Sequence, residues 1–181
     1  MLRAIFLLIA ITLPGVAQVD VQRLLGIYDH TRPGIAILVR KHSRTEYTLK
    51  LGLRDLRTKG AIDSRTNFRL ASVTKQFTAT AIMLLIKDGK LRYDTRLTDV
   101  FPDFPAYAHE ITIRHLLNHT SGLPDYEELM DHAGKEWTAE DQISDAEVFE
   151  LLKRAPSPKF APGTKWSYSN SGYVLLCVIA A

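Results

Sequence analysis

A serine and a lysine stand three residues apart in the segment Ser72-Val73-Thr74-Lys75. Three residues on a helix place two side chains on the same face. A serine hydroxyl becomes a strong nucleophile only when an adjacent base takes its proton, and a lysine amine kept neutral by desolvation can be that base. The spacing therefore predicts acyl transfer through Ser72, activated by Lys75. The alternative is a helix-capping serine followed by a surface lysine, because a Ser-x-x-Lys arises by chance about once in a chain of this length.

Tyr168 and Asn170 form a second candidate pair in the loop before the last apolar segment. A tyrosine hydroxyl close to Ser72 can exchange protons with it. The Asn170 amide can donate hydrogen bonds to a substrate amide and accept them from it. Taken alone, the pair favours a plainer interpretation, in which the tyrosine packs on the core and the asparagine caps the following helix.

Other candidate residues point less clearly to chemistry. His115 and His119 have a metal-ligand spacing, but a zinc hydrolase helix carries Glu after the first histidine, and this chain has Leu116. We therefore expect neither a metal nor a cofactor. Three acidic residues are interpreted as a solvated turn rather than as a catalytic carboxylate pair: Asp125, Glu127 and Glu128.

Composition sets limits on the class of protein. The 181 residues are 46% hydrophobic and 24% charged, which is typical of a globular domain. A net charge of +3 is spread along the chain without a basic run, so a nucleic-acid partner is not expected. A single cysteine, Cys177, excludes a disulfide within the chain.

The N-terminus has the pattern of a secretory signal peptide. Arg3 precedes an apolar stretch over residues 4–13, and Gly15 and Ala17 are small residues at the positions that a signal peptidase recognises. A membrane anchor needs roughly 20 apolar residues, so this stretch is too short to be one. We expect cleavage after Ala17, export to the periplasm or the extracellular space, and a mature domain over residues 18–181 without a stable membrane span.

The elements that must position these residues follow from periodicity and turn chemistry. The clearest is a helix whose apolar residues recur on one face, predicted to be its buried face: Val73, Phe77, Thr80, Ala81, Leu84 and Leu85. The other predicted elements are, in order, a helix over 19–30, a β-hairpin of 35–39 and 45–51, connecting structure over 53–70, a helix from Thr112 to His119, a helix over 146–154 capped by Ser144 or Asp145, and a last helix from Ser171.

Three segments around the candidate residues occur together and in order: FRLASVTKQFT (68–78), HLLNHTSGLP (115–124) and PGTKWSYSNSGY (162–173). They resemble the serine hydrolase family of class C β-lactamases, D-alanyl-D-alanine carboxypeptidases and related esterases. The resemblance covers nearly all of residues 19–181. It implies that Ser72 is acylated, that Lys75 and Tyr168 act together as general base and later acid, and that Asn170 contacts the substrate amide. The segment from His119 to Leu123 is interpreted as a structural wall of the site.

The resemblance also implies a fold, and it implies that part of this fold is absent. The fold is α+β and β-lactamase/transpeptidase-like, an antiparallel sheet beside a helical region. It is expected to be incomplete, because the C-terminal strands and the family's third motif, Lys-Thr-Gly or His-x-Gly, do not follow Asn170. That strand carries one oxyanion-hole donor, whose loss costs about 10²–10³ in rate.

Two functions follow as expectations. The first is a serine hydrolase acting on a small-molecule or peptide substrate, namely a β-lactam, a D-amino-acid peptide or an ester, with this truncated chain itself inactive. The second is a non-catalytic remnant that binds peptidoglycan-like peptides. A metal-dependent hydrolase rests only on His115 and His119.

Overall fold

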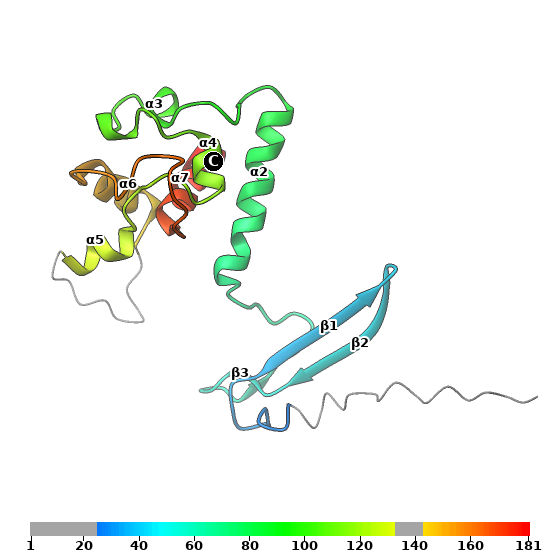
Figure 1. Ribbon diagram of the computed structural model, residues 1–181. Helices are drawn as coiled ribbons and strands as arrows, with labels where there is room; N and C mark the ends of the chain where they lie inside the picture. Colours follow the sequence, from blue (N-terminus) through cyan, green and yellow to red (C-terminus); the bar gives the residue numbers. More distant parts are fainter. Residues whose placement is uncertain (1–24, 133–142) are drawn as a thin grey trace, which may run out of the picture. The chain divides into compact units, whose positions relative to one another are not determined.

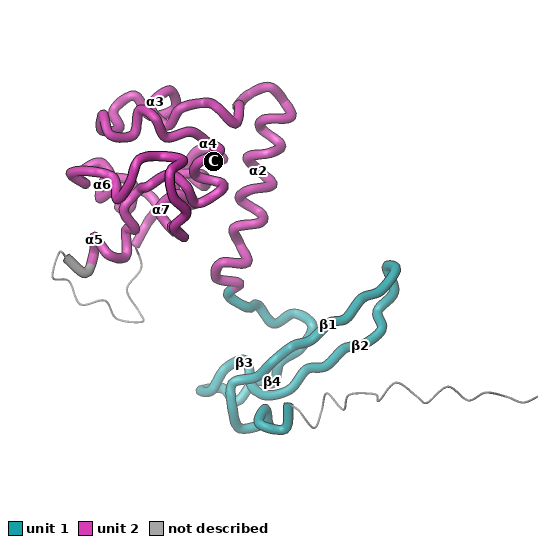
Figure 2. The backbone as a smooth tube through the Cα atoms, in the orientation of Figure 1, with its two compact units in different colours: residues 1–69 teal, residues 70–181 magenta. Residues whose placement is uncertain are grey.

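The computed structural model describes residues 25–132 and 143–181. The chain forms two compact units, residues 1–69 and 70–181 (Figure 2). The predicted signal peptide and most of the helix predicted over 19–30 lie outside the described residues. The described end of that helix is wrong, because residues 25–30 contain turns and no helix. The Asp29 carboxylate accepts the Thr31 N–H at 2.8 Å, a local bond that favours a turn.

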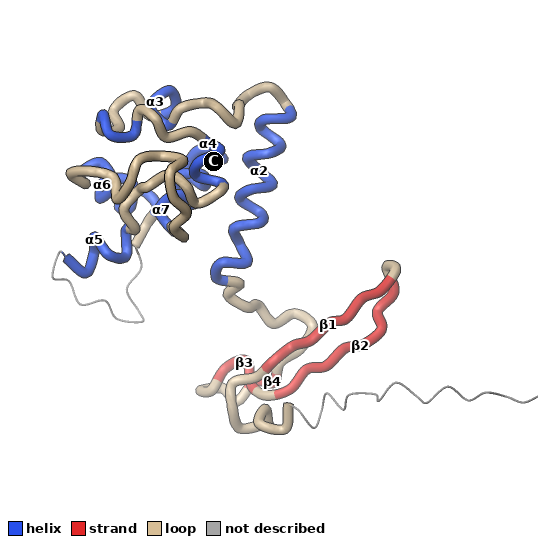
Figure 3. The backbone as a smooth tube through the Cα atoms, viewed as in Figure 1, coloured by secondary structure: helices blue, strands red, loops and turns tan. Residues whose placement is uncertain are grey.

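The first unit contains two small antiparallel sheets (Figure 3). Strands β1 (Ile35–Lys41) and β2 (Arg44–Leu51) form the predicted hairpin. His42 and Ser43 connect them with φ values of 47° and 64°, as a type I′ turn requires.

The second sheet was not predicted. Strands β3 (Leu53–Asp55) and β4 (Gly60–Ala61) lie in the segment expected to be connecting structure. Gly52, with φ of 81°, precedes β3, and a Cβ there would lie 2.4 Å from the Gly34 Cα. This close backbone approach needs glycine, so the short strand depends on a contact that hydrophobic periodicity does not reveal.

The second unit is built from helices (Figure 1). They are, in order, η1 (Ala71–Thr74), α2 (Lys75–Lys87), α3 (Leu97–Val100), η2 (Ala106–Ala108), α4 (Ile113–Leu117), α5 (Tyr126–His132), α6 (Asp145–Arg154) and α7 (Asn170–Ala180). Their core is fully buried aliphatic side chains that include Ile82, Ile113, Leu116, Leu152 and Leu175. In the part of the chain that the structure describes, no helix combines the length and the apolar character needed to cross a membrane.

The helix α2 was predicted at the right place but with the wrong buried face. Val73 and Phe77, from the predicted apolar stripe, are 54% and 60% exposed. The side chain that is fully buried is Ile82, and Leu85 and Ile86 pack beside it on the core. Because α2 is apolar around most of its circumference, periodicity alone cannot select the face that packs on α7.

Helix caps were predicted more accurately, because they depend on local bonds. Thr112 Oγ1 accepts the His115 N–H at 3.4 Å and caps α4, which ends two residues before the predicted end. Ser144, rather than Asp145, caps α6, and its own N–H is bound by Glu147 at 2.8 Å. At α7 the cap is Ser169, whose Oγ accepts the Gly172 N–H at 3.2 Å. The plainer interpretation of Asn170 as a cap is therefore wrong.

Candidate active site

The two predicted residue pairs meet at one place in the second unit. Ser72 Oγ and the Tyr168 hydroxyl are hydrogen-bonded at 2.6 Å, although 96 residues separate them. The Lys75 ammonium donates to Ser72 Oγ at 3.4 Å and to Asn170 Oδ1 at 2.8 Å. A serine, a lysine, a tyrosine and an asparagine thus form one continuous hydrogen-bonded cluster.

Local backbone geometry aligns Ser72 with Lys75. Ser72 lies in the 3₁₀ turn η1, not in the first turn of the α-helix as expected, and Lys75 is the first residue of α2. Side chains three residues apart eclipse each other in a 3₁₀ turn, so the ammonium lies beside the hydroxyl. Ala71, just before Ser72, has φ of 46°. Such left-handed backbone at a non-glycine residue is strained and is typical of functional sites.

The segment from His119 to Leu123 holds the loop that carries Tyr168. Its carbonyls accept three backbone N–H groups, namely Lys159 to Gly122, Gly163 to Thr120 and Ser167 to His119, at 2.8, 2.8 and 2.9 Å. Gly122 has φ of 73°, and a Cβ there would lie 2.0 Å from the Phe160 carbonyl oxygen. The two segments therefore approach each other too closely for any residue but glycine.

Acidic residues fix Asn170 from the other side. The Asp125 carboxylate accepts the Asn170 N–H at 2.9 Å, and Glu127 accepts from Asn170 Nδ2 at 3.3 Å. Asp125 is therefore not a residue of a solvated turn, whereas Glu127 and Glu128 are exposed in the first turn of α5. Asp125 also accepts the Glu127 N–H at 3.1 Å where α5 begins. An Asp before a helix is a recognisable start signal, but nothing local in the sequence connects it to residue 170.

The charges in the cluster shift its titrating groups. Hydrogen bonding from Lys75, and then from Ser72, lowers the pKa of the Tyr168 phenol below its ordinary value of 10.0, although burial and Asp125 oppose this. Lys75 Nζ also lies 4.8 Å from the centre of the Tyr168 ring. A tyrosine that ionises more readily, within hydrogen-bond distance of a serine hydroxyl, is suited to accept its proton.

The two histidines each accept a hydrogen bond from a backbone N–H group. His115 Nδ1 accepts the Thr112 N–H at 3.3 Å, and His119 Nδ1 accepts the Ser169 N–H at 3.2 Å. Among the described residues, no group of three or more His, Cys, Asp and Glu side chains is arranged to hold a metal ion. The structure brings Ser72, Lys75, Tyr168 and Asn170 together.

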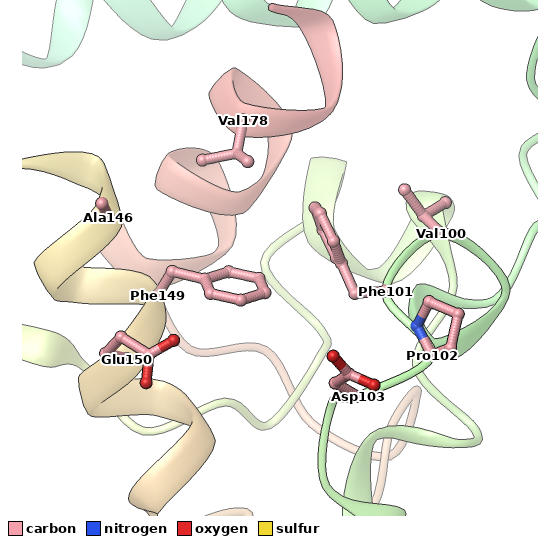
Figure 4. Close-up of a pocket in the computed structure, with 8 residues that line it drawn as sticks. All are labelled: Val100, Phe101, Pro102, Asp103, Ala146, Phe149, Glu150 and Val178. Atoms are coloured by element: carbon pink, nitrogen blue, oxygen red, sulfur yellow. The ribbon is translucent and has the colours of Figure 1, made fainter.

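Two hollows of the second unit are lined by different kinds of residue. A small one of about 180 Å³ lies beside Lys75 and Asn170, between α2 and α7. A larger one of about 510 Å³ is mostly apolar and lies between the α3 segment, α6 and α7 (Figure 4). It is lined by Val100, Phe101, Pro102, Asp103, Ala146, Phe149, Glu150 and Val178. These residues include two carboxylates but no serine, cysteine, histidine or lysine, so the larger hollow lacks a nucleophile with its base.

Known proteins are similar to this chain over most of its length. A penicillin-binding protein of Bacillus subtilis (strain 168) is 39% identical over 134 residues, which are 74% of this chain and 29% of the relative. Esterase EstB of Burkholderia gladioli is 36% identical over 158 residues, which are 81% of this chain and 40% of the relative. The chain thus spans well under half the length of these relatives.

Solved structures show the same relationship in the fold. The D-amino acid amidase from Ochrobactrum anthropi SV3 superimposes with a TM-score of 0.63 at 34% identity, covering 82% of this chain and 39% of the amidase. The octameric penicillin-binding protein homologue from Pyrococcus abyssi gives a TM-score of 0.69 at 29% identity, over 83% and 35%. The expected α+β, β-lactamase/transpeptidase-like fold is therefore confirmed as a partial fold. The sequence model of the Beta-lactamase family matches residues 16–181, and the chain belongs to that family of serine hydrolases.

Proposed function

We propose that this protein transfers acyl groups through Ser72. The observation that carries the proposal is the 2.6 Å hydrogen bond between Ser72 Oγ and the Tyr168 hydroxyl, with Lys75 bonded to Ser72. Tyr168 as phenolate takes the Ser72 proton while Oγ attacks the substrate carbonyl carbon. The same proton then passes from Tyr168 to the leaving group as its bond to the carbonyl breaks. Tyr168 then takes a proton from water, whose oxygen attacks the acyl carbon. The bond from that carbon to Ser72 Oγ breaks, and Tyr168 returns the proton to Oγ.

Lys75 and Asn170 have supporting roles in this mechanism. The Lys75 ammonium stabilises the phenolate form of Tyr168, in keeping with the lowered pKa of that phenol. Lys75, which is hydrogen-bonded to Ser72, also shares the transfer of the Ser72 proton with Tyr168. Asn170 Oδ1 accepts from Lys75 at 2.8 Å, and one of the two N–H groups on Nδ2 donates to Glu127 at 3.3 Å, so the second N–H of Nδ2 is the group left to donate to a substrate carbonyl. Asn170 is thereby suited to hold an amide-bearing substrate while its oxygen holds the lysine.

The substrate belongs to the carbonyl compounds open to attack by an activated serine. A β-lactam, a D-amino-acid peptide and an ester are all of this kind. The relatives named above, a penicillin-binding protein, an esterase and a D-amino acid amidase, support this range. The proposal includes a small-molecule or peptide substrate and no cofactor.

Export is part of the proposal. It rests on the charge, apolar stretch and small residues of the first 17 residues. N-terminal sequencing of the protein from a secreting host should begin at Gln18. A mature protein that still begins at Met1 would contradict export by this route.

A labelling experiment tests the reaction. A neutral fluorophosphonate loses fluoride to an activated serine and leaves a stable phosphonyl adduct, which intact-mass spectrometry detects. Phosphonylation needs a single attack and accumulates with time, so it is expected even from a chain that does not turn over substrate. We expect one adduct on the wild-type protein, none on Ser72→Ala, and one on the control Ser64→Ala, which alters an exposed serine of the first unit.

The non-catalytic alternative makes a different prediction for the same protein. It expects binding of a D-alanyl-D-alanine peptide by calorimetry without any adduct in the wild type. An adduct that persists in Ser72→Ala would remove Ser72 from the nucleophilic role.

A further inference from the structure

His119 touches the loop that carries Tyr168 through both its backbone and its ring. Its carbonyl accepts the Ser167 N–H at 2.9 Å, and its Nδ1 accepts the Ser169 N–H at 3.2 Å. The imidazole stacks on the Tyr168 ring with centres 4.7 Å apart and planes inclined by 30°. One histidine thus contacts the Tyr168 ring and the backbone of both residues that flank Tyr168 in the sequence.

The His119 ring has an aromatic environment of its own. Tyr173 lies 5.1 Å from it at the same inclination, and Trp166 meets it edge-on at 6.2 Å. A side chain packed among three aromatic rings has few rotamers open to it, so it offers Tyr168 a fixed surface. Tyr168 is itself 43% exposed, and the other groups that restrain its ring are the Ser72 hydroxyl and the Lys75 ammonium.

The hydrogen bond from Ser169 defines the protonation state of the His119 ring that stacks on Tyr168. A backbone N–H can donate only to an unprotonated Nδ1, so the neutral ring carries its proton on Nε2. Burial, and then the positive charge of Lys75, lower the pKa of His119 below 6.5. The titratable groups around the ring are Lys75, Tyr168 and Tyr173, and Asp125 acts on Tyr168. At neutral pH His119 is therefore a neutral acceptor.

The geometry points to His119 as a positioning residue for Tyr168. The neutral ring stacks on the phenol and binds the next backbone N–H, and so holds the hydroxyl at hydrogen-bond distance from Ser72. This inference rests on the proposed function, because positioning matters to the reaction only if Tyr168 moves the Ser72 proton. His119 does not exchange a proton with the substrate itself.

Two substitutions separate the ring from the hydrogen bond. His119→Asn keeps an acceptor and suits the local φ of 58°, but it removes the stacking ring. His119→Phe keeps a ring and removes both the acceptor and the titrating group. The matched control is His109→Asn, which alters an exposed histidine near Thr98.

Two quantities are measured. The first is the maximal rate constant of fluorophosphonate labelling. The second is the ultraviolet titration of Tyr168, obtained by subtracting the titration curve of the same protein with the additional Tyr168→Phe substitution. In His119→Asn we expect the rate constant to fall about tenfold, the size of a lost aromatic contact, with the concentration for half-maximal rate unchanged. The Tyr168 pKa should rise toward 10. His119→Phe should retain a rate within about threefold of wild type, since it keeps the ring. The His109→Asn control should match wild type.

The pH profile gives a readout that does not depend on His119→Asn folding. The wild-type rate should show a loss as pH falls through the His119 pKa, because a protonated Nδ1 and the Ser169 N–H are then two donors that face each other. His119→Phe places no donor there and should lack that step. Identical wild-type and His119→Phe profiles would overturn the inference, as would a His119→Asn protein with wild-type rate and Tyr168 titration. If the wild type is not labelled at all, the proposed function fails, and the Tyr168 titration in His119→Asn still decides whether His119 positions the phenol.

Discussion

Replacing Lys75 by methionine and by arginine separates two roles of its ammonium group. The first role is electrostatic, since Nζ lies 3.4 Å from Ser72 Oγ, where negative charge develops during attack. The second is proton transfer together with Tyr168. Methionine removes both roles, whereas arginine keeps a charge but cannot give up its proton.

The structure sets the magnitude of each role. At 3.4 Å, Coulomb's law gives about 1 kcal/mol in water and about 5 kcal/mol at an effective dielectric constant of 20. Ser72 is exposed, so the lower value applies, and the charge alone contributes a factor of roughly ten. A positioned proton-transfer group contributes about 10²–10⁴. We therefore expect the labelling rate constant to fall by at least about 10² in both variants, a loss that indicates proton transfer.

The assay is the rate constant of fluorophosphonate labelling at pH 7.5, a chosen working pH. Lys87→Met is the matched control, because Lys87 is an exposed lysine in the last turn of the same helix. A Lys75→Arg protein that labels at a near-normal rate would refute the proton-transfer role of Lys75 and leave Tyr168 as the base. A Lys75→Met protein within about threefold of wild type would refute both roles, since even the charge alone predicts a factor of roughly ten.

Three further predictions concern the residues around this pair. Gly122→Ala should destabilise the protein by at least about 2 kcal/mol in urea unfolding, since it combines left-handed backbone with a clash. Gly89→Ala, with φ of 72° but open space around its Cβ, should cost only about 1 kcal/mol. Asp125→Asn should lower the Tyr168 pKa further in ultraviolet titration, because Asp125 raises it; an unchanged titration would contradict that coupling. The pKa of His119 is lowered from 6.5 in the folded protein. As pH falls, His119 therefore takes up a proton in the unfolded state before it does so in the folded state. The His119 contribution to unfolding free energy should be complete above pH 6.5 and be lost as pH falls through the folded-state pKa, and urea unfolding of His119→Phe should lack this loss.

Features that depend on neighbouring residues could be predicted from the sequence. The serine hydroxyl and the lysine ammonium are one turn apart, so backbone geometry alone brings them together. The caps Thr112 and Ser144, and the turn between β1 and β2, likewise depend on bonds within a few residues. The resemblance of three segments added Tyr168 and Asn170, which spacing alone did not favour.

Features that depend on distant contacts were decided only by the tertiary structure. The face of α2 that is buried depends on α7, because both sides of that helix carry apolar residues. Asp125 reaches Asn170 across 45 residues, and Ser169 reaches His119 across 50. These bonds form because the loop before α7 packs on the His119–Leu123 segment, where glycine allows the backbones to approach. Local pattern therefore determined that Ser72 and Lys75 lie side by side, while packing determined what orients them.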